Sequence, residues 1–128
     1  MAKKILLVDD DPDFLYQTKL QLEKFGFEVI SADSQLEAEE ILLKVKPDLA
    51  ILDLMMESED SGFILSYKLR HKYPDVPIII ATAVSAETGI FFGLESDEEK
   101  KWINADLYLE KGITAEQLNK EISKLLKL

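Results

Sequence analysis

The chain has 128 residues, of which 47% are hydrophobic and 31% are charged, and its formal net charge is −10. This length suits a single domain with a full core, and no apolar stretch approaches the roughly 18 residues of a membrane span. Lysine and arginine are not clustered as in nucleic-acid surfaces, so a nucleic acid is not expected as a partner. Without a spanning segment, a membrane is not expected as a partner either. The lack of cysteine and of a signal-type apolar segment indicates a cytoplasmic location.

The first half of the chain alternates predicted strands with amphipathic helices. Pro12 suits a first helical turn, apolar side chains recur at helical spacing after it, and Gly26 ends the pattern. Ser34 and Glu37 form a capping-box pattern at the start of the next helix. The elements expected here are a strand at 4–8, a helix at 12–25, a strand at 27–31, a helix from Ser34 to before Pro47, and a strand at 49–52.

The second half continues this alternation. A fully apolar run after Pro74 indicates a strand buried on both faces, and Thr114 with Gln117 caps the last helix. The elements expected here are a helix at 63–73, a strand at 76–81, a late helix from Ser96 through Trp102, a strand at 107–109, and a helix from Thr114. Five strand–helix units predict a flavodoxin-like α/β domain over 1–128: a doubly wound, parallel, five-stranded sheet in the order 2-1-3-4-5 with five helices.

Aspartates follow two of the predicted strands. Asp9 and Asp10 come directly after the apolar run at 5–8, and Asp53 follows the run at 49–52. Because parallel strands place their carboxyl ends at one edge of a sheet, these carboxylates are expected in one pocket. Crowded carboxylates raise each other's pKa unless a hard divalent cation joins them. The sequence therefore predicts a Mg²⁺ site at this edge.

Four stretches of the chain resemble the receiver domains of two-component response regulators, which have the CheY-like fold. They are VDDDP at 8–12, PDLAILDLMM at 47–56, ATA at 81–83 and DLYLEK at 106–111. Each is weak alone, but together they occur in order and at the expected strand ends. The resemblance implies that Asp53 accepts a phosphoryl group from a sensor histidine kinase or a histidine phosphotransfer protein.

The resemblance also implies roles for the residues around Asp53. These are Mg²⁺ binding by Asp9, Asp10, Asp53 and the backbone carbonyl of Met55, contact with the phosphoryl oxygens by Thr82 and Lys111, and a rotamer change on activation by Tyr108. Such a domain catalyses only its own phosphorylation and dephosphorylation. Since the sequence ends with the last predicted helix, we expect a stand-alone receiver without an output domain, which acts on a downstream protein target.

Single residues of this set have plainer explanations. Lys111 alone would be a solvated charge, Asp53 a turn residue and Thr82 a strand end. Their expected place at one edge of the sheet favours the functional interpretation. Outside this set, we interpret Asp11 as a first-turn helix residue favoured by the helix dipole, and His71 as solvated.

Three features depart from the family pattern. Gly112 stands where proline usually follows the lysine, and a cis bond to a non-proline residue costs about 2.5–4 kcal/mol. We therefore expect a trans Lys111–Gly112 bond. The segment at 56–63 is more acidic and one residue longer than usual, and the stretch from Thr82 to Lys111 is several residues longer.

Two predictions depend on these variable segments. The resemblance implies that polar side chains at positions 55 and 84 can orient a hydrolytic water. Met55 and Val84 are apolar, so we expect a long-lived phosphorylated state that Met55→Asn shortens. The apolar stretch at 90–94 and the late helix are expected to form the partner-binding face, with Phe91 or Phe92 as an anchor.

Other classes of protein fit the sequence less well. A phosphatase of the haloacid dehalogenase type needs a second aspartate two positions after Asp53, where this chain has Met55. A nucleotide-binding enzyme needs a glycine-rich loop after its first strand, and the acidic segment at 9–12 is its electrostatic opposite. The strongest alternative is a degenerate receiver that is never phosphorylated and acts as a constitutive protein-interaction module.

Overall fold

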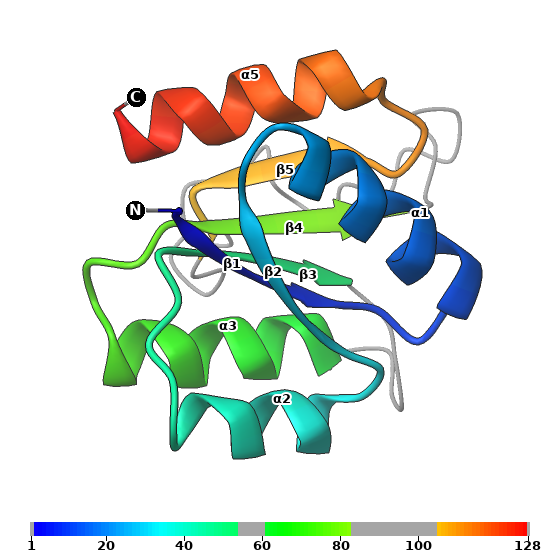
Figure 1. Cartoon of the computed structure of the whole chain (residues 1–128). Coiled ribbons are helices and arrows are strands. Elements are labelled where there is room, and N and C mark those ends of the chain that lie inside the picture. Colours follow the sequence, from blue (N-terminus) through cyan, green and yellow to red (C-terminus); the bar gives the residue numbers. More distant parts are fainter. Residues whose placement is uncertain (1, 54–60, 83–104, 128) are drawn as a thin grey trace, which may run out of the picture.

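The structure of the chain is a computed structural model that describes residues 2–53, 61–82 and 105–127. In it, helices cover both faces of one parallel sheet (Figure 1). The strands are β1 (Lys4–Val8), β2 (Glu28–Ala32), β3 (Leu49–Asp53), β4 (Ile78–Thr82) and β5 (Leu107–Glu110). The helices are α1 (Pro12–Lys24), α2 (Gln35–Leu42), α3 (Ser61–Lys72) and α5 (Ala115–Leu126).

The sheet has the predicted topology. Its strands lie in the order β2-β1-β3-β4-β5, and every neighbouring pair is parallel. Helices α2 and α3 cover one face, while α1 and α5 lie on the other (Figure 1). The described ranges contain four helices, and the fifth predicted helix, from Ser96 through Trp102, lies outside them. Within those ranges, every helix is too short or too polar to cross a membrane.

The core has two layers because strand side chains alternate between the faces of the sheet. In β1, Leu6 and Val8 join the cluster under α2 and α3, whereas Ile5 and Leu7 join the cluster under α1 and α5. The last helix contributes Leu118 and Ile122 to the second layer, as its periodicity predicts. Strands that are apolar on both faces are typical of a parallel sheet between two layers of helices.

Capping residues fix the ends of the helices. Glycine at position 26 has φ 93°, a left-handed conformation that ends the first helix at low steric cost. The side chains of Ser34 and Thr114 accept hydrogen bonds from the backbone N–H groups of Glu37 and Gln117 at 3.1 and 3.2 Å. Both predicted N-caps are therefore confirmed.

The interpretation of Asp11 as a first-turn residue is wrong. Its Oδ1 accepts hydrogen bonds from the backbone N–H groups of Asp13 and Phe14 at 3.0 and 3.4 Å, so Asp11 is the N-cap of α1. The reason is that Pro12 occupies the first helical position, where its missing N–H costs nothing. A short carboxylate just before it reaches the free N–H groups of the first turn.

A second aspartate holds the opposite end of the sheet. Asp106 precedes β5, and its Oδ2 accepts a hydrogen bond from the backbone N–H of Ile78 at 2.8 Å. The same oxygen pairs with the guanidinium of Arg70 at 2.5 Å, at the end of α3. We call this end of the sheet the amino edge, and the end where the strands finish the carboxyl edge. Asp106 thus ties α3, β4 and β5 together at the amino edge.

Candidate functional site

The carboxyl edge brings the predicted site residues together. Asp9 comes directly after β1, Asp53 is the last residue of β3, and Lys111 comes directly after β5. The register pairs Asp53 with Ala81 and Thr82 with Glu110, so β3, β4 and β5 end side by side. The acidic pocket expected from strand ends alone is therefore present.

Three carboxylates form the centre of this site. Asp9, Asp10 and Asp53 each offer one oxygen, and these oxygens all lie within 4.8 Å of one another. Asp9 is fully buried, Asp53 is 6% exposed, and Asp10 is open to solvent. The backbone N–H of Asp11 donates to Asp9 Oδ1 at 2.9 Å, which holds this carboxylate in place.

A single ammonium group faces two of these carboxylates. Lys111 Nζ lies 2.7 Å from Asp9 Oδ2 and 3.2 Å from Asp53 Oδ1. The described backbone has no cis peptide bond, so the Lys111–Gly112 bond is trans as expected. Glycine in place of proline is therefore compatible with a lysine that reaches the acidic cluster.

The charges of the site shift its protonation equilibria. Burial, together with the negative charge of Asp9, raises the pKa of Asp53 to about 7, although the ammonium of Lys111 opposes this change. Burial alone would lower the pKa of Lys111, but the adjacent carboxylates of Asp9 and Asp53 raise it overall. A cluster that holds one lysine cation still carries excess negative charge at neutral pH.

The donor set fits a hard divalent cation. Asp9 Oδ2 is enclosed and, within the described residues, forms no hydrogen bond of good geometry, although it pairs with Lys111. Carboxylate oxygens are the ligands that Mg²⁺ prefers, and one or two carboxylates with water usually suffice. Asp9, Asp10 and Asp53 could therefore hold such an ion. The backbone carbonyl of Met55, the fourth predicted ligand, lies outside the described residues.

The two predicted switch residues lie on the last two strands. The backbone of Thr82 ends β4 at the carboxyl edge, and its side chain is outside the described part. Tyr108 pairs with Ile80 and packs against the core layer under α2 and α3. Its hydroxyl has no hydrogen-bond partner within the described residues, and burial raises its pKa. The rotamer change of Tyr108 stays a prediction.

Several other predictions concern residues outside the described ranges. They include Val84, the acidic loop up to residue 60, and the proposed partner-binding segment with Phe91, Phe92 and the late helix. His71 is exposed as expected, and its ring stacks on Tyr67 with a centroid separation of 6.2 Å.

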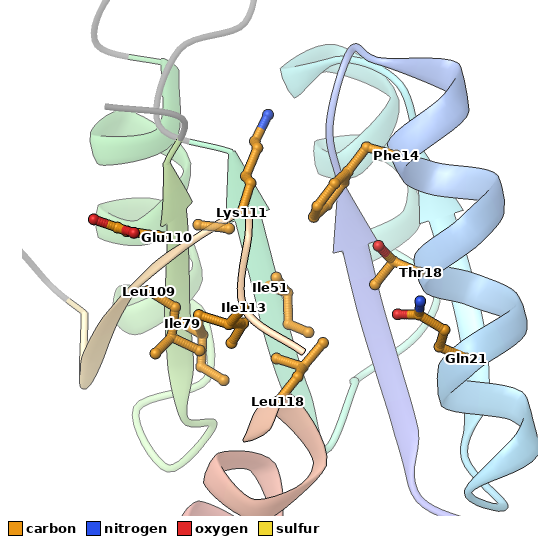
Figure 2. Close-up of a pocket in the computed structure, with 11 residues that line it drawn as sticks. Phe14, Thr18, Gln21, Ile51, Ile79, Leu109, Glu110, Lys111, Ile113 and Leu118 are labelled. Carbon is orange, nitrogen blue, oxygen red and sulfur yellow. The ribbon is translucent and has the colours of Figure 1, made fainter. Parts of the chain in front are cut away.

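Sequence reasoning missed one residue of this site. Phe14, in the first turn of α1, places its ring 5.0 Å from Lys111 Nζ (Figure 2). The sequence pattern showed it only as part of the apolar face of a helix. The available signal was its position in the first turn of a helix that begins at the carboxyl edge.

A small pocket lies between α1 and the segment that joins β5 to α5 (Figure 2). Phe14 and Lys111 line it, together with Thr18 and Gln21 from α1 and Ile113 and Leu118 from the other side. Its volume is about 40 Å³, which accommodates water but is far below the several hundred Å³ of a typical cofactor site. The chemistry of this region therefore belongs to the acidic cluster.

Comparison with known proteins agrees with this geometry. The family model described as the response regulator receiver domain matches residues 5–123. The alkaline phosphatase synthesis transcriptional regulatory protein PhoP of Bacillus subtilis is 32% identical over 127 residues, which are 99% of this chain and 50% of PhoP. The probable transcriptional regulator ycf27 of Porphyridium aerugineum is 35% identical, over 98% of this chain and 48% of that protein. The chain thus spans about half the length of these curated relatives.

Solved structures show the same fold. A CheY-like receiver domain protein from Methanospirillum hungatei superposes with a TM-score of 0.84 at 28% identity, over 99% of this chain and 95% of that one. The response regulator TrrA of Thermotoga maritima, solved with Mg²⁺ and BeF, gives a TM-score of 0.78 at 30% identity, over 96% of this chain and 98% of that one. With its parallel sheet, its acidic carboxyl edge and these relatives, the chain belongs to the response regulator receiver domains of two-component systems.

Proposed function

We propose that Asp53 is the phosphoryl acceptor of this receiver and that Mg²⁺ is its cofactor. The observation that carries the proposal is the position of Asp53, which lies nearly buried within ion-pair distance of Lys111 and beside the carboxylates of Asp9 and Asp10. Asp106, at the amino edge, is instead occupied by a backbone N–H and an arginine. Asp53 combines a reactive carboxylate with nearby positive charge.

The proposed step is a phosphoryl transfer. A carboxylate oxygen of Asp53 attacks the phosphorus of a phosphohistidine, the P–N bond breaks, and the imidazole leaves and takes up a proton. The product is an acyl phosphate on Asp53. Negative charge on the phosphoryl oxygens repels the attacking carboxylate, and the Lys111 ammonium offsets this repulsion because it already lies 3.2 Å from Asp53.

The carboxylates of Asp9 and Asp10 are proposed ligands of Mg²⁺. Asp9 and Asp10 would hold Mg²⁺ with Asp53, and the bound ion would neutralise charge that develops on the transferred group. The hydrogen bond from the Asp11 N–H fixes one face of Asp9, so its other oxygen keeps a constant place in the pocket. This arrangement fixes the carboxylate of Asp9 beside Asp53 before a donor arrives.

The proposed partners follow from this chemistry. We propose a sensor histidine kinase or a histidine phosphotransfer protein as donor and a separate protein as target. The domain would catalyse only its own phosphorylation and dephosphorylation.

The test is incubation of the protein with acetyl phosphate and Mg²⁺, followed by intact-mass measurement. The wild type is expected to gain the mass of one phosphoryl group, and Asp53→Asn is expected to gain none. Asp48→Asn is a matched control, because Asp48 lies at the other end of β3, where its Oδ2 accepts the backbone N–H of Lys4 at 2.7 Å. A wild type that gains no phosphate would favour the constitutive interaction module instead.

A further inference from the structure

We infer that Phe14 is a positioning residue for Lys111 in the proposed phosphoryl transfer. Its ring lies 5.0 Å from the Lys111 ammonium, which at the same time contacts Asp9 at 2.7 Å and Asp53 at 3.2 Å. The ammonium therefore lies between two carboxylates and one aromatic face. This inference rests on the proposed function, because it assigns Phe14 a role in the reaction at Asp53.

Lysine needs such a support more than most residues. Its ammonium is a compact charge on a flexible four-carbon stem, so its position is set by what surrounds it. Lys111 follows the last residue of β5, and Glu110, its neighbour in the chain, points away from Phe14 (Figure 2). From α1, the ring of Phe14 thus contacts the Lys111 ammonium.

The interaction is of the cation–π type and takes place in a partly buried site. An ammonium within about 6 Å of an aromatic centroid is attracted by the electrons of the ring face, and desolvation strengthens this attraction. The side chain of Lys111 is only 19% exposed. The ring therefore favours the lysine rotamer in which Nζ lies over Asp9 and Asp53, ready to meet an incoming phosphoryl oxygen.

A purely structural role for Phe14 makes a different prediction. Phe14 also packs against the core layer under α1 and α5. If packing were its whole role, a substitution that loosens this layer would weaken Mg²⁺ binding and phosphorylation together. A positioning role predicts slower phosphorylation without weaker Mg²⁺ binding. The reason is that a less constrained ammonium competes less with Mg²⁺ for Asp9 and Asp53 and meets the phosphoryl group less often.

The variants Phe14→Leu and Phe14→Tyr separate the two roles. Leucine keeps an apolar side chain without a ring, and tyrosine keeps the ring. With acetyl phosphate at saturating Mg²⁺, Phe14→Leu is expected to slow phosphorylation of Asp53 by about threefold to tenfold, whereas Phe14→Tyr stays within about twofold of the wild type. The Mg²⁺ affinity of Phe14→Leu, measured by calorimetry, is expected to equal or exceed that of the wild type.

Two controls sharpen this experiment. Tyr16→Leu removes a solvent-exposed aromatic from the same helix and is expected to leave the rate unchanged. In a Lys111→Met background, Phe14→Leu is expected to cause no further loss of rate, because the ring then has no ammonium to position.

In NMR spectra, the methylene protons beside Lys111 Nζ should show an upfield ring-current shift that Phe14→Leu removes and Phe14→Tyr retains.

The outcomes distinguish this inference from the proposed function. A wild type that gains no phosphate would overturn the proposed function and the role of Phe14 with it. Normal phosphorylation of the wild type, with an unchanged rate in Phe14→Leu, would overturn the inference alone. Slower phosphorylation with weaker Mg²⁺ binding and no rescue by tyrosine would also overturn it, in favour of a packing role.

Discussion

The two edges of the sheet use aspartate in opposite ways. At the amino edge, one oxygen of Asp106 meets a backbone N–H and the guanidinium of Arg70, so one negative charge has one positive partner. At the carboxyl edge, the ammonium of Lys111 pairs with Asp9 and Asp53, and Asp10 adds a third carboxylate that has no cationic partner among the described residues. The Asp106–Arg70 pair is balanced, whereas among the described residues the acidic cluster has three carboxylates and one ammonium.

This difference explains why the Asp106–Arg70 pair has a structural role and the acidic cluster is a candidate ion site. A balanced pair joins helix to sheet and gains nothing from a further ion. In the acidic cluster, burial and the charge of Asp9 raise the pKa of Asp53 to about 7. A cation that binds between these carboxylates therefore lowers the free energy of the folded state. The carboxyl edge is therefore where we propose that Mg²⁺ and a phosphoryl group bind.

The largest expected effect comes from removing the cation at each edge. Lys111→Met should slow phosphorylation by acetyl phosphate by about 100- to 1,000-fold, the usual effect of losing one group that stabilises developing charge. Arg70→Met should leave this rate within about twofold and lower the free energy of unfolding by about 1 kcal/mol. Mass spectrometry over time and urea unfolding measure the two quantities. Equal effects of both variants on the rate would contradict the difference between the two edges.

The next effect is a dependence of stability on pH. The folded state holds the proton of Asp53 up to about pH 7, whereas the unfolded chain releases it near pH 3.8. Between these values the folded state binds more protons, so the metal-free stability should fall as pH rises through this window, by about 2–4 kcal/mol. Urea unfolding between pH 4 and pH 8 measures the change.

The variant Asp53→Asn tests the origin of this dependence. Since asparagine has no proton to lose, its metal-free stability should decline less between pH 4 and pH 8 than that of the wild type. Saturating Mg²⁺ should recover the lost stability of the wild type at pH 8. A wild-type decline that persists unchanged in Asp53→Asn would assign the dependence to another group.

A smaller effect is expected from the exposed carboxylate of the cluster. Asp10→Ala should weaken Mg²⁺ binding by about tenfold or more, because it removes both an oxygen ligand and a charge. Asp13→Ala removes a nearby exposed carboxylate on α1 and serves as the control. Calorimetric titration of both variants gives the comparison, and an unchanged affinity in Asp10→Ala would exclude Asp10 as a ligand.

The smallest effect concerns the acidic residue next to the cluster. Asp11 caps α1, so Asp11→Ala should lower the free energy of unfolding by about 1 kcal/mol, as should Thr114→Ala at the cap of α5. Neither variant should prevent phosphorylation of Asp53. If Asp11→Ala weakened Mg²⁺ binding as strongly as Asp10→Ala, then Asp11 would belong to the site rather than to the helix cap.

The fold could be predicted from the sequence because the strands are continuous apolar runs and the helices carry caps and a regular apolar face. The acidic site followed from the same pattern, since parallel strands bring Asp9 and Asp53 to one edge. Two features could not be predicted. The contact between Phe14 and Lys111 joins α1 to the end of β5, and the pairing of Asp106 with Arg70 joins β5 to α3. Both depend on how helices pack on the sheet, which periodicity does not encode.

The most direct test of the unbalanced carboxyl edge is the number of protons released when Mg²⁺ binds. Calorimetry at pH 7 in buffers with different ionisation enthalpies measures this number. With the pKa of Asp53 about 7, the metal-free carboxyl is half protonated, so Mg²⁺ binding should release about half a proton in the wild type and far less in Asp53→Asn. Mg²⁺ binding with no proton release at pH 7, or with equal release in both proteins, would contradict this account.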